Sequence, residues 1–189
     1  TGIRDGTLNL ILRSRFEKEI SRSAPDLKKE FAEELERLKK DKKSLQGKLN
    51  NMTGRFAEFQ LFTEFRARKR FCLSEYFGGV TDNTELNITE SRMRFKFHLP
   101  DGKESEIDVA AESDCGRMIL AEVKKTADKT GLPGVRIFHE KTERFAECFP
   151  EKKILPVFLS AGGFTPDALT FCEEKGIGTA ESIAFFQAV

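Results

Sequence analysis

The sequence predicts an α/β (α+β) fold with an αβββαβ core and a mixed central sheet, preceded by a long helical arm. Three patterns predict it. Apolar residues follow a 4-3 spacing through residues 31–59, the period of a coiled-coil helix. Two runs of alternating polarity flank a turn at residues 113–116, which indicates a β-hairpin. A continuous apolar run at residues 154–159 is typical of a buried parallel strand.

Residues 1–53 are predicted to form the arm. A four-residue apolar spacing indicates a short helix over residues 8–20, and Pro25 suits the first position of a second helix. The seam of that helix consists of Phe31, Leu35, Leu38, Lys42, Leu45, Leu49, Met52, Phe56 and Phe59. Gly47 and Gly54 weaken the helix and allow a bend. The seam favours a coiled-coil homodimer; a lone helix packed on its own domain, or an antiparallel pairing with the first helix, are the alternatives.

Residues 54–189 are predicted to form the folded domain. A helix over residues 54–77 carries an apolar stripe expected to pack in the core, formed by Phe56, Phe59, Phe62 and Phe65. A polar stretch precedes the first strand, at residues 92–99, and a turn at residues 100–103 follows it. After the central hairpin come a helix at 134–149, the buried strand at 154–159, a helix at 166–175 and a short strand at 177–179.

The central hairpin joins residues 104–112 to residues 117–125. With its turn centred near Cys115, Asp108 lies opposite Glu122 and Glu106 lies opposite Lys124. Side chains alternate along a strand, so Glu122 and Lys124 share one face and Asp108 can join them. Carboxylates that converge among apolar residues cost free energy unless they are paired, and a divalent cation is the obvious partner. The alternative is a solvated cross-strand ion pair worth less than about 1 kcal/mol.

Asp108, followed after thirteen residues by Glu122-Val123-Lys124, resembles the signature of the PD-(D/E)XK nuclease superfamily, which has the restriction-endonuclease-like fold. Ile107 stands where the motif has Pro. The resemblance covers roughly residues 54–179, and coiled-coil segments ahead of such a domain resemble a group of prokaryotic members.

This resemblance implies a metal-dependent nuclease. Asp108, Glu122 and the backbone carbonyl of Val123 would hold Mg²⁺ or Mn²⁺, and Lys124 would orient or activate the attacking water. Glu58 resembles the acid that the preceding helix of the superfamily leans towards the metal. Glu106 would ligate a second metal or pair with Lys124.

DNA is the expected partner, and RNA is not excluded. The basic residues expected to contact nucleic acid are Arg66, Arg68, Lys69, Arg70 and Lys125. The formal net charge is only +1, with residues 1–53 at +4 and the remainder at −3, which argues against tight non-specific binding by the domain alone. The alternatives are a catalytically inactive nucleic-acid-binding module and a coiled-coil assembly protein.

Other functional classes find little support in the sequence. It has no apolar run long enough for a membrane span and no signal segment, which predicts a cytoplasmic protein without a membrane partner. Its four cysteines are widely spaced and are expected to be free thiols. His98 and His139 are isolated, so a zinc site is not expected.

Overall fold

The computed structural model describes residues 6–23 and 25–181 of the 189-residue chain. The contacts divide the chain into two units, residues 1–49 and residues 50–189. One helix runs across residue 49 and across residue 53, so the predicted domain boundary after residue 53 remains a prediction. Each unit is described by itself.

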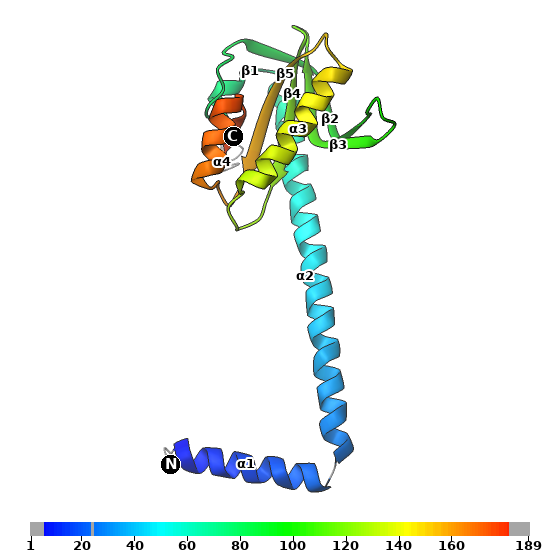
Figure 1. Ribbon diagram of the computed structural model, residues 1–189, viewed down its shortest axis with the longest axis vertical. Coiled ribbons are helices and arrows are strands. Elements are labelled where there is room, and N and C mark those ends of the chain that lie inside the picture. Colours follow the sequence, from blue (N-terminus) through cyan, green and yellow to red (C-terminus); the bar gives the residue numbers. More distant parts are fainter. Residues whose placement is uncertain (1–5, 24, 182–189) are drawn as a thin grey trace. The chain divides into compact units, whose positions relative to one another are not determined.

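The arm contains helix α1 (Gly6–Ser23) and the first part of helix α2 (Pro25–Arg68), which begins at the predicted proline (Figure 1). Helix α2 continues through Gly47 and Gly54 without interruption. The apolar residues of the seam are exposed, with fractions between 48% at Phe59 and 70% at Met52. The helix is therefore regular, and its apolar stripe faces solvent.

The end of α2 differs from the prediction of a helix up to residue 77. The helix ends at Arg68, Lys69 adopts a left-handed conformation with φ 56°, and strand β1 (Arg70–Cys72) follows. A short 3₁₀ helix, η1 (Leu73–Glu75), comes next. The reason is tertiary: Phe71 is buried in the core and its ring stacks 5.7 Å from that of Phe65. Burial of Phe71 therefore outweighs the helix propensity of this segment.

A six-stranded sheet forms the centre of the second unit, in the order β1-β2-β3-β4-β5-β6. The further strands are β2 (Glu85–His98), β3 (Glu104–Ser113), β4 (Arg117–Lys124), β5 (Lys153–Ser160) and β6 (Gly178–Ala180). The first four are antiparallel, and β4, β5 and β6 are parallel. Strand β2 begins earlier than predicted, because Leu86 and Ile88 are also buried. The mixed sheet predicted from the sequence is present.

The central hairpin has the predicted register. Val109 pairs with Ala121 and Ala110 with Leu120, as a turn centred near residue 115 requires. Gly116 in that turn has φ 74°, and Gly102 in the preceding turn has φ 80°, a region that glycine enters without strain.

Helices cover both faces of the sheet. The C-terminal part of α2 packs on one face through Ala57, Leu61 and Phe65, while Phe56 and Phe59 of the predicted core stripe remain about half exposed. Helices α3 (Leu132–Cys148) and α4 (Pro166–Lys175) pack on the other face (Figure 1). The core therefore has two layers of side chains, and the residues of β4 from Met118 to Ala121 alternate between them.

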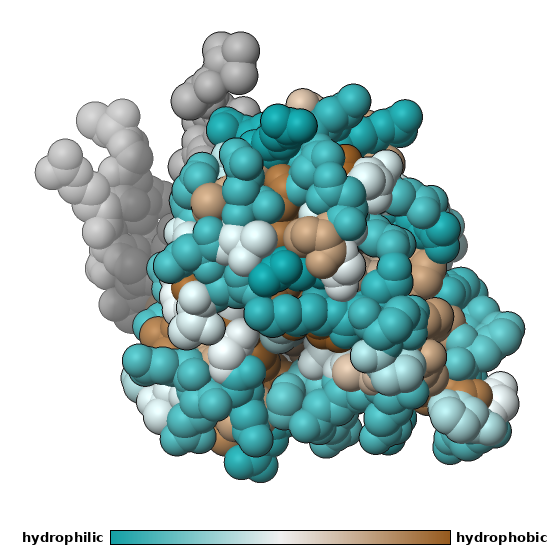
Figure 2. Space-filling view, turned by 90° about the horizontal axis from the view of Figure 1, so that it is seen from above, coloured by the Kyte–Doolittle hydropathy of each residue, from teal (hydrophilic) through white to brown (hydrophobic). Residues whose placement is uncertain are grey.

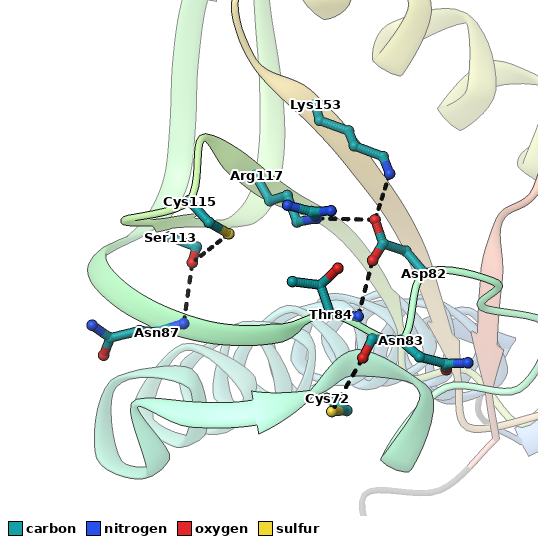
Figure 3. Close-up of polar contacts among 9 residues, drawn as sticks. All are labelled: Cys72, Asp82, Asn83, Thr84, Asn87, Ser113, Cys115, Arg117 and Lys153. Atoms are coloured by element: carbon teal, nitrogen blue, oxygen red, sulfur yellow. Dashed lines mark hydrogen bonds and ion pairs between the residues drawn. The ribbon is translucent and has the colours of Figure 1, made fainter.

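The turn end of the hairpin is fixed by polar contacts (Figure 3). Asp82 accepts hydrogen bonds from Arg117 Nε at 3.0 Å and from Lys153 Nζ at 2.6 Å, and from the backbone N–H of Thr84 at 3.0 Å. These contacts tie the loop before β2 to strands β4 and β5. They hold the carboxylate ionised and keep the pKa of Asp82 far below its usual value, chiefly through Lys153.

None of the described helices is long and apolar enough to cross a membrane. The surface seen in Figure 2 is mostly hydrophilic, with apolar side chains in small separate patches. All four cysteines are free thiols, as predicted.

Candidate active site

The candidate site lies where β3 and β4 diverge. Their pairing extends to Val109 and Ala121, while β4 remains paired with β5 as far as Lys124. Beyond the last β3–β4 pair, the backbone N–H of Val123 donates to Asp108 Oδ2 at 2.8 Å. The aspartate therefore takes the hydrogen bond that a paired strand would have supplied, which satisfies a buried donor and orients the carboxylate.

Asp108 is an acid in an unfavourable environment. Burial is the main cause that raises its pKa from 3.8 to about 6, and the charge of Glu122 raises it further. The hydrogen bond from Val123 and the charge of Lys141 oppose the shift but do not cancel it. The two carboxylates are thus close enough to repel each other.

Glu122 is 8% exposed and lies between two lysines. Its Oε1 is 3.3 Å from Lys124 Nζ, and its Oε2 is 3.2 Å from Lys141 Nζ. Lys124 is about half exposed, so its ammonium group faces solvent while it contacts the acid. The predicted grouping of Asp108, Glu122 and Lys124 is therefore present in the structure.

The fold is decided by these elements together. A helix, a three-stranded antiparallel meander, a helix, a parallel strand and a further helix follow one another, and the meander's second hairpin brings the acids and the lysine together. The chain has the restriction-endonuclease-like fold. The αβββαβ order and mixed sheet predicted from the sequence are thereby confirmed by the chain's own topology.

The comparisons with known proteins add context to this fold. No protein-family model and no curated protein matches the chain. Among solved structures, it is similar to a protein of unknown function, AF1548, at 22% identity and a TM-score of 0.41, over 48% of this chain and 47% of the other. A repair endonuclease from Pyrococcus abyssi matches at 14% identity and a TM-score of 0.36, over 48% and 39%.

A third solved structure, Can2 from Sulfobacillus thermosulfidooxidans in complex with cyclic tetra-adenylate, matches at 18% identity and a TM-score of 0.47, over 68% of this chain and 32% of the other. Each match spans less than half of the other chain. At this level the comparisons concern the fold, and the function has to be inferred from the site.

Glu58 on α2 is the third acid of the PD-(D/E)XK site predicted from the sequence. Its Oε2 is buried and has no hydrogen-bond partner among the described residues. Burial raises the pKa of Glu58, the Arg94 charge lowers it, and the charges of Glu106 and Glu122 raise it. An orphaned carboxylate oxygen beside other acids is a position that a cation would satisfy.

The sequence suggested two roles for Glu106, a second metal ligand or a partner of Lys124, and the pairing with Lys124 does not occur. Arg94 Nη2 lies 2.8 Å from Glu106 Oε1, because Glu106 lies beyond the last β3–β4 pair, where β3 is paired with β2 alone. Arg94 itself has φ 53°, a left-handed conformation that is uncommon for a residue with a side chain. It places a guanidinium group near the acids, where its charge acts on Glu58 and Asp108.

Lys141 on α3 was missed by the sequence analysis. It lies one turn from the buried Phe138 and beside the buried Thr142, at the edge of the helix face that packs on the sheet. The signal available in the sequence was a lysine next to the apolar stripe of the helix that follows the Glu-x-Lys strand.

Two of the five basic residues predicted to contact nucleic acid are engaged within the protein. Arg68 Nε is 3.4 Å from Glu64 Oε2, and its guanidinium lies 5.3 Å from the centre of the Tyr76 ring. Lys125 Nζ lies 5.7 Å from the centre of the Phe56 ring. These contacts fix the two side chains but leave their charges near the surface.

The other three lie around the end of α2. Arg66 and Lys69 line a polar cavity of about 430 Å³ together with Thr89 and Ser91, and Arg70 is exposed at the start of β1. The hydroxyl oxygen of Ser91 is buried and has no partner among the described residues. Glu90 also lines the cavity, with its carboxylate paired to Arg92 at 2.8 Å. The cations and hydroxyl groups of the lining supply the chemistry that binds a phosphate.

The donor set of the acidic cluster suits a hard divalent cation, since Asp108, Glu122 and Glu58 supply carboxylate oxygens. The raised pKa values and the orphaned Glu58 oxygen fit such an ion. In the part of the chain that the structure describes, no three such side chains are arranged closely enough to hold a metal as they stand. The lysines occupy both oxygens of Glu122 instead.

Proposed function

We propose that the chain is a metal-dependent nuclease that hydrolyses phosphodiester bonds, with DNA as the expected substrate. The observation that carries the proposal is the pair of partly buried Asp108 and buried Glu122, brought together from adjacent strands with Lys124 beside them. A structural ion pair would lower the pKa of its acid, whereas the pKa of Asp108 is raised to about 6. Frustrated acids of this kind cluster at functional sites.

Asp108, Glu122 and Glu58, with the backbone carbonyl of Val123, would hold Mg²⁺ or Mn²⁺. A bound divalent cation lowers the pKa of water and neutralises charge on the phosphate in the transition state. Lys124, whose ammonium group contacts Glu122, would orient the attacking water and offset the developing negative charge.

The remaining residues position these groups. The Val123 N–H fixes one oxygen of Asp108, and Lys141 holds Glu122 from the helix side. Arg66 and Lys69, with the hydroxyls of Thr89 and Ser91, would contact phosphate oxygens of the nucleic acid. Contacts of this type hold a strand without reading its sequence.

The test uses the full chain with supercoiled plasmid, single-stranded DNA and RNA, in Mg²⁺, Mn²⁺ or EDTA. We expect cleavage with either metal, none in EDTA, and a loss of at least about 100-fold in Lys124→Met. Lys103→Met is the matched control, because Lys103 pairs with Asp101 in an exposed turn. Undiminished cleavage by Lys124→Met would contradict the site. Gel-shift binding without cleavage in the wild-type chain would favour the inactive binding module.

We further propose that the chain forms a homodimer through α2. The exposed 4-3 stripe supports this, because an apolar seam of about four heptads is stable in water only when it is covered. Light scattering should give the mass of two chains. The mass of one chain at micromolar concentration would contradict dimerisation and leave the nuclease proposal untouched.

A further inference from the structure

The α2 stripe, defined here as the seam residues between Phe31 and Phe59, also carries information about orientation. Of its nine positions, eight are apolar and exposed, and the ninth is Lys42. In heptad notation the alternation of four- and three-residue steps places Lys42 at an a position, with Leu38 and Leu45 at the adjacent d positions. Gly47 and Gly54 fall at f, the position farthest from a partner helix. Any preference for one orientation rests on the proposed dimerisation.

The charged residues beside the stripe are unequally distributed. The g positions are Glu34, Asp41, Lys48 and Arg55, two acids followed by two bases, and all four are exposed. The e positions are Ala32, Lys39, Gln46 and Thr53, of which only Lys39 is charged. Since e and g residues flank the seam, their charges decide how two copies pair.

Parallel pairing uses these charges poorly. Each g residue then meets the e residue five positions further along the partner, so Glu34 meets the partner's Lys39. Asp41 and Lys48 meet the uncharged Gln46 and Thr53. Two Lys42 ammonium groups also face each other within the seam, where like charges repel.

Antiparallel pairing uses all four charges at the g positions when Lys42 lies beside the partner's Leu45. Each g residue then faces a g residue of the partner. Asp41 faces the partner's Lys48, and Glu34 faces the partner's Arg55. By symmetry each pair occurs twice, so four attractive pairs form and the two Lys42 side chains are separated.

The neighbouring antiparallel registers are worse. A shift of one heptad in one direction places Asp41 opposite the partner's Asp41. The opposite shift places Lys48 opposite the partner's Lys48. Both alternatives put like charges at the centre of the pairing, so the charge pattern selects one register as well as one orientation.

We propose that two copies of the chain pair through α2 as an antiparallel coiled coil, with Lys42 beside Leu45 of the partner subunit.

A charge exchange tests orientation and register together. Asp41→Lys and Lys48→Asp each turn two attractive pairs into repulsive ones in the antiparallel dimer. The double variant restores attraction. In the parallel dimer both residues face uncharged partners, so all three variants should dimerise like the wild type. The measurement is the dimer dissociation constant by sedimentation equilibrium in low salt, with helicity by circular dichroism to check folding.

We expect each single variant to weaken dimerisation by about tenfold or more, and the double variant to return within about threefold of the wild type. Single variants that dimerise normally, with Glu34→Lys weakened and restored by Lys39→Glu, would overturn the antiparallel arrangement in favour of the parallel one. A monomeric wild type would overturn dimerisation itself. The plasmid assay reports separately on the nuclease proposal.

Discussion

The two ends of the central hairpin hold acids in opposite states. At the turn end, Asp82 accepts bonds from Arg117 and Lys153, and its pKa is held far below the usual value. At the open end, Asp108 accepts one backbone hydrogen bond, and burial beside Glu122 raises its pKa to about 6. Both acids lie close to lysines and to strand β4, so proximity to positive charge does not distinguish them.

The difference lies in whether the protein satisfies the carboxylate. Asp82 is fully provided with donors, so its ionised form stabilises the fold and has no capacity left for a ligand. Asp108, with Glu58 nearby, is ionised at a cost. An acid that costs the folded state free energy is expected where it binds a ligand, and this contrast favours the open end of the hairpin as the functional one in our proposal.

The largest effect is expected from Asp108→Asn, which keeps the acceptor for the Val123 N–H but removes the charge. Cleavage should fall by about 1,000-fold, since the amide is a poor ligand for a hard cation. A plasmid assay with increasing Mg²⁺ measures this loss. Asp82→Asn serves as the control in the same assay, and equal losses in both variants would remove the distinction between the two ends.

The same Asp108→Asn variant should be more stable than the wild type when no divalent cation is present. The folded pKa of about 6 exceeds the ordinary aspartate value of 3.8, so the unfolded chain ionises first. The wild type therefore loses stability relative to the variant as the pH rises from about 4 to 6, and the difference then levels off. A shift of about two pH units corresponds to about 3 kcal/mol. Urea unfolding at pH 4 and pH 7 in EDTA tests this; a variant less stable at pH 7 would contradict it.

A smaller effect is expected from Lys141→Met, which retains the apolar part of the side chain and removes the contact with Glu122 Oε2. Lys141 orients a metal-binding residue in our proposal, so cleavage should fall by about 10- to 100-fold. The metal concentration for half-maximal cleavage should change with it. Lys129→Met, on the loop before α3, is the control. A loss as severe as that of Lys124→Met would assign Lys141 a direct part in the reaction.

At the turn end, Asp82→Asn should affect stability alone. The variant loses charged hydrogen bonds to Arg117 and Lys153, each typically worth about 1.5–3 kcal/mol. Because the folded pKa of Asp82 is lowered, its contribution is fully present above about pH 4, decreases as the pH falls below the unfolded pKa and is lost only as the pH passes through the folded pKa. Thermal unfolding at pH 7 and pH 3 should show a deficit at both, smaller at the lower pH.

The sequence predicted the hairpin because two local signals agree there. The turn at residues 113–116 fixes the centre, and alternation of polarity fixes the faces, so the register followed by counting. The tail was predictable for a similar reason, since Pro166 and Gly176 mark the two ends of α4. Turn residues, polarity alternation and helix end signals predict structure from the sequence alone where they agree with the final fold.

The errors arose where distant contacts decide. Strand β1 and the early start of β2 depend on each other, because Phe71 pairs with Leu86 across the sheet. Glu106 binds Arg94 rather than Lys124 because the β3–β4 pairing ends at Val109, while β3 stays paired with β2. Lys141 reaches Glu122 only through the packing of α3 on the sheet. None of these pairings leaves a periodic signal within one segment.

The smallest effect is expected from Glu58→Gln, because the protein satisfies the Glu58 carboxylate less than that of Asp82 but offsets part of its charge. Glu58 Oε2 is buried without a partner among the described residues, yet Arg94 offsets part of the cost of its charge. Removing the charge should raise the stability without metal by less than about 1 kcal/mol. It should also raise the Mg²⁺ concentration for half-maximal cleavage by about tenfold, with the maximal rate reduced less.

Calorimetric titration of the cation and a metal series in the plasmid assay measure the two effects. Glu64→Gln, on the same helix and paired with Arg68, is the matched control. An unchanged metal dependence would place Glu58 outside the site and leave Asp108 and Glu122 as its only acids.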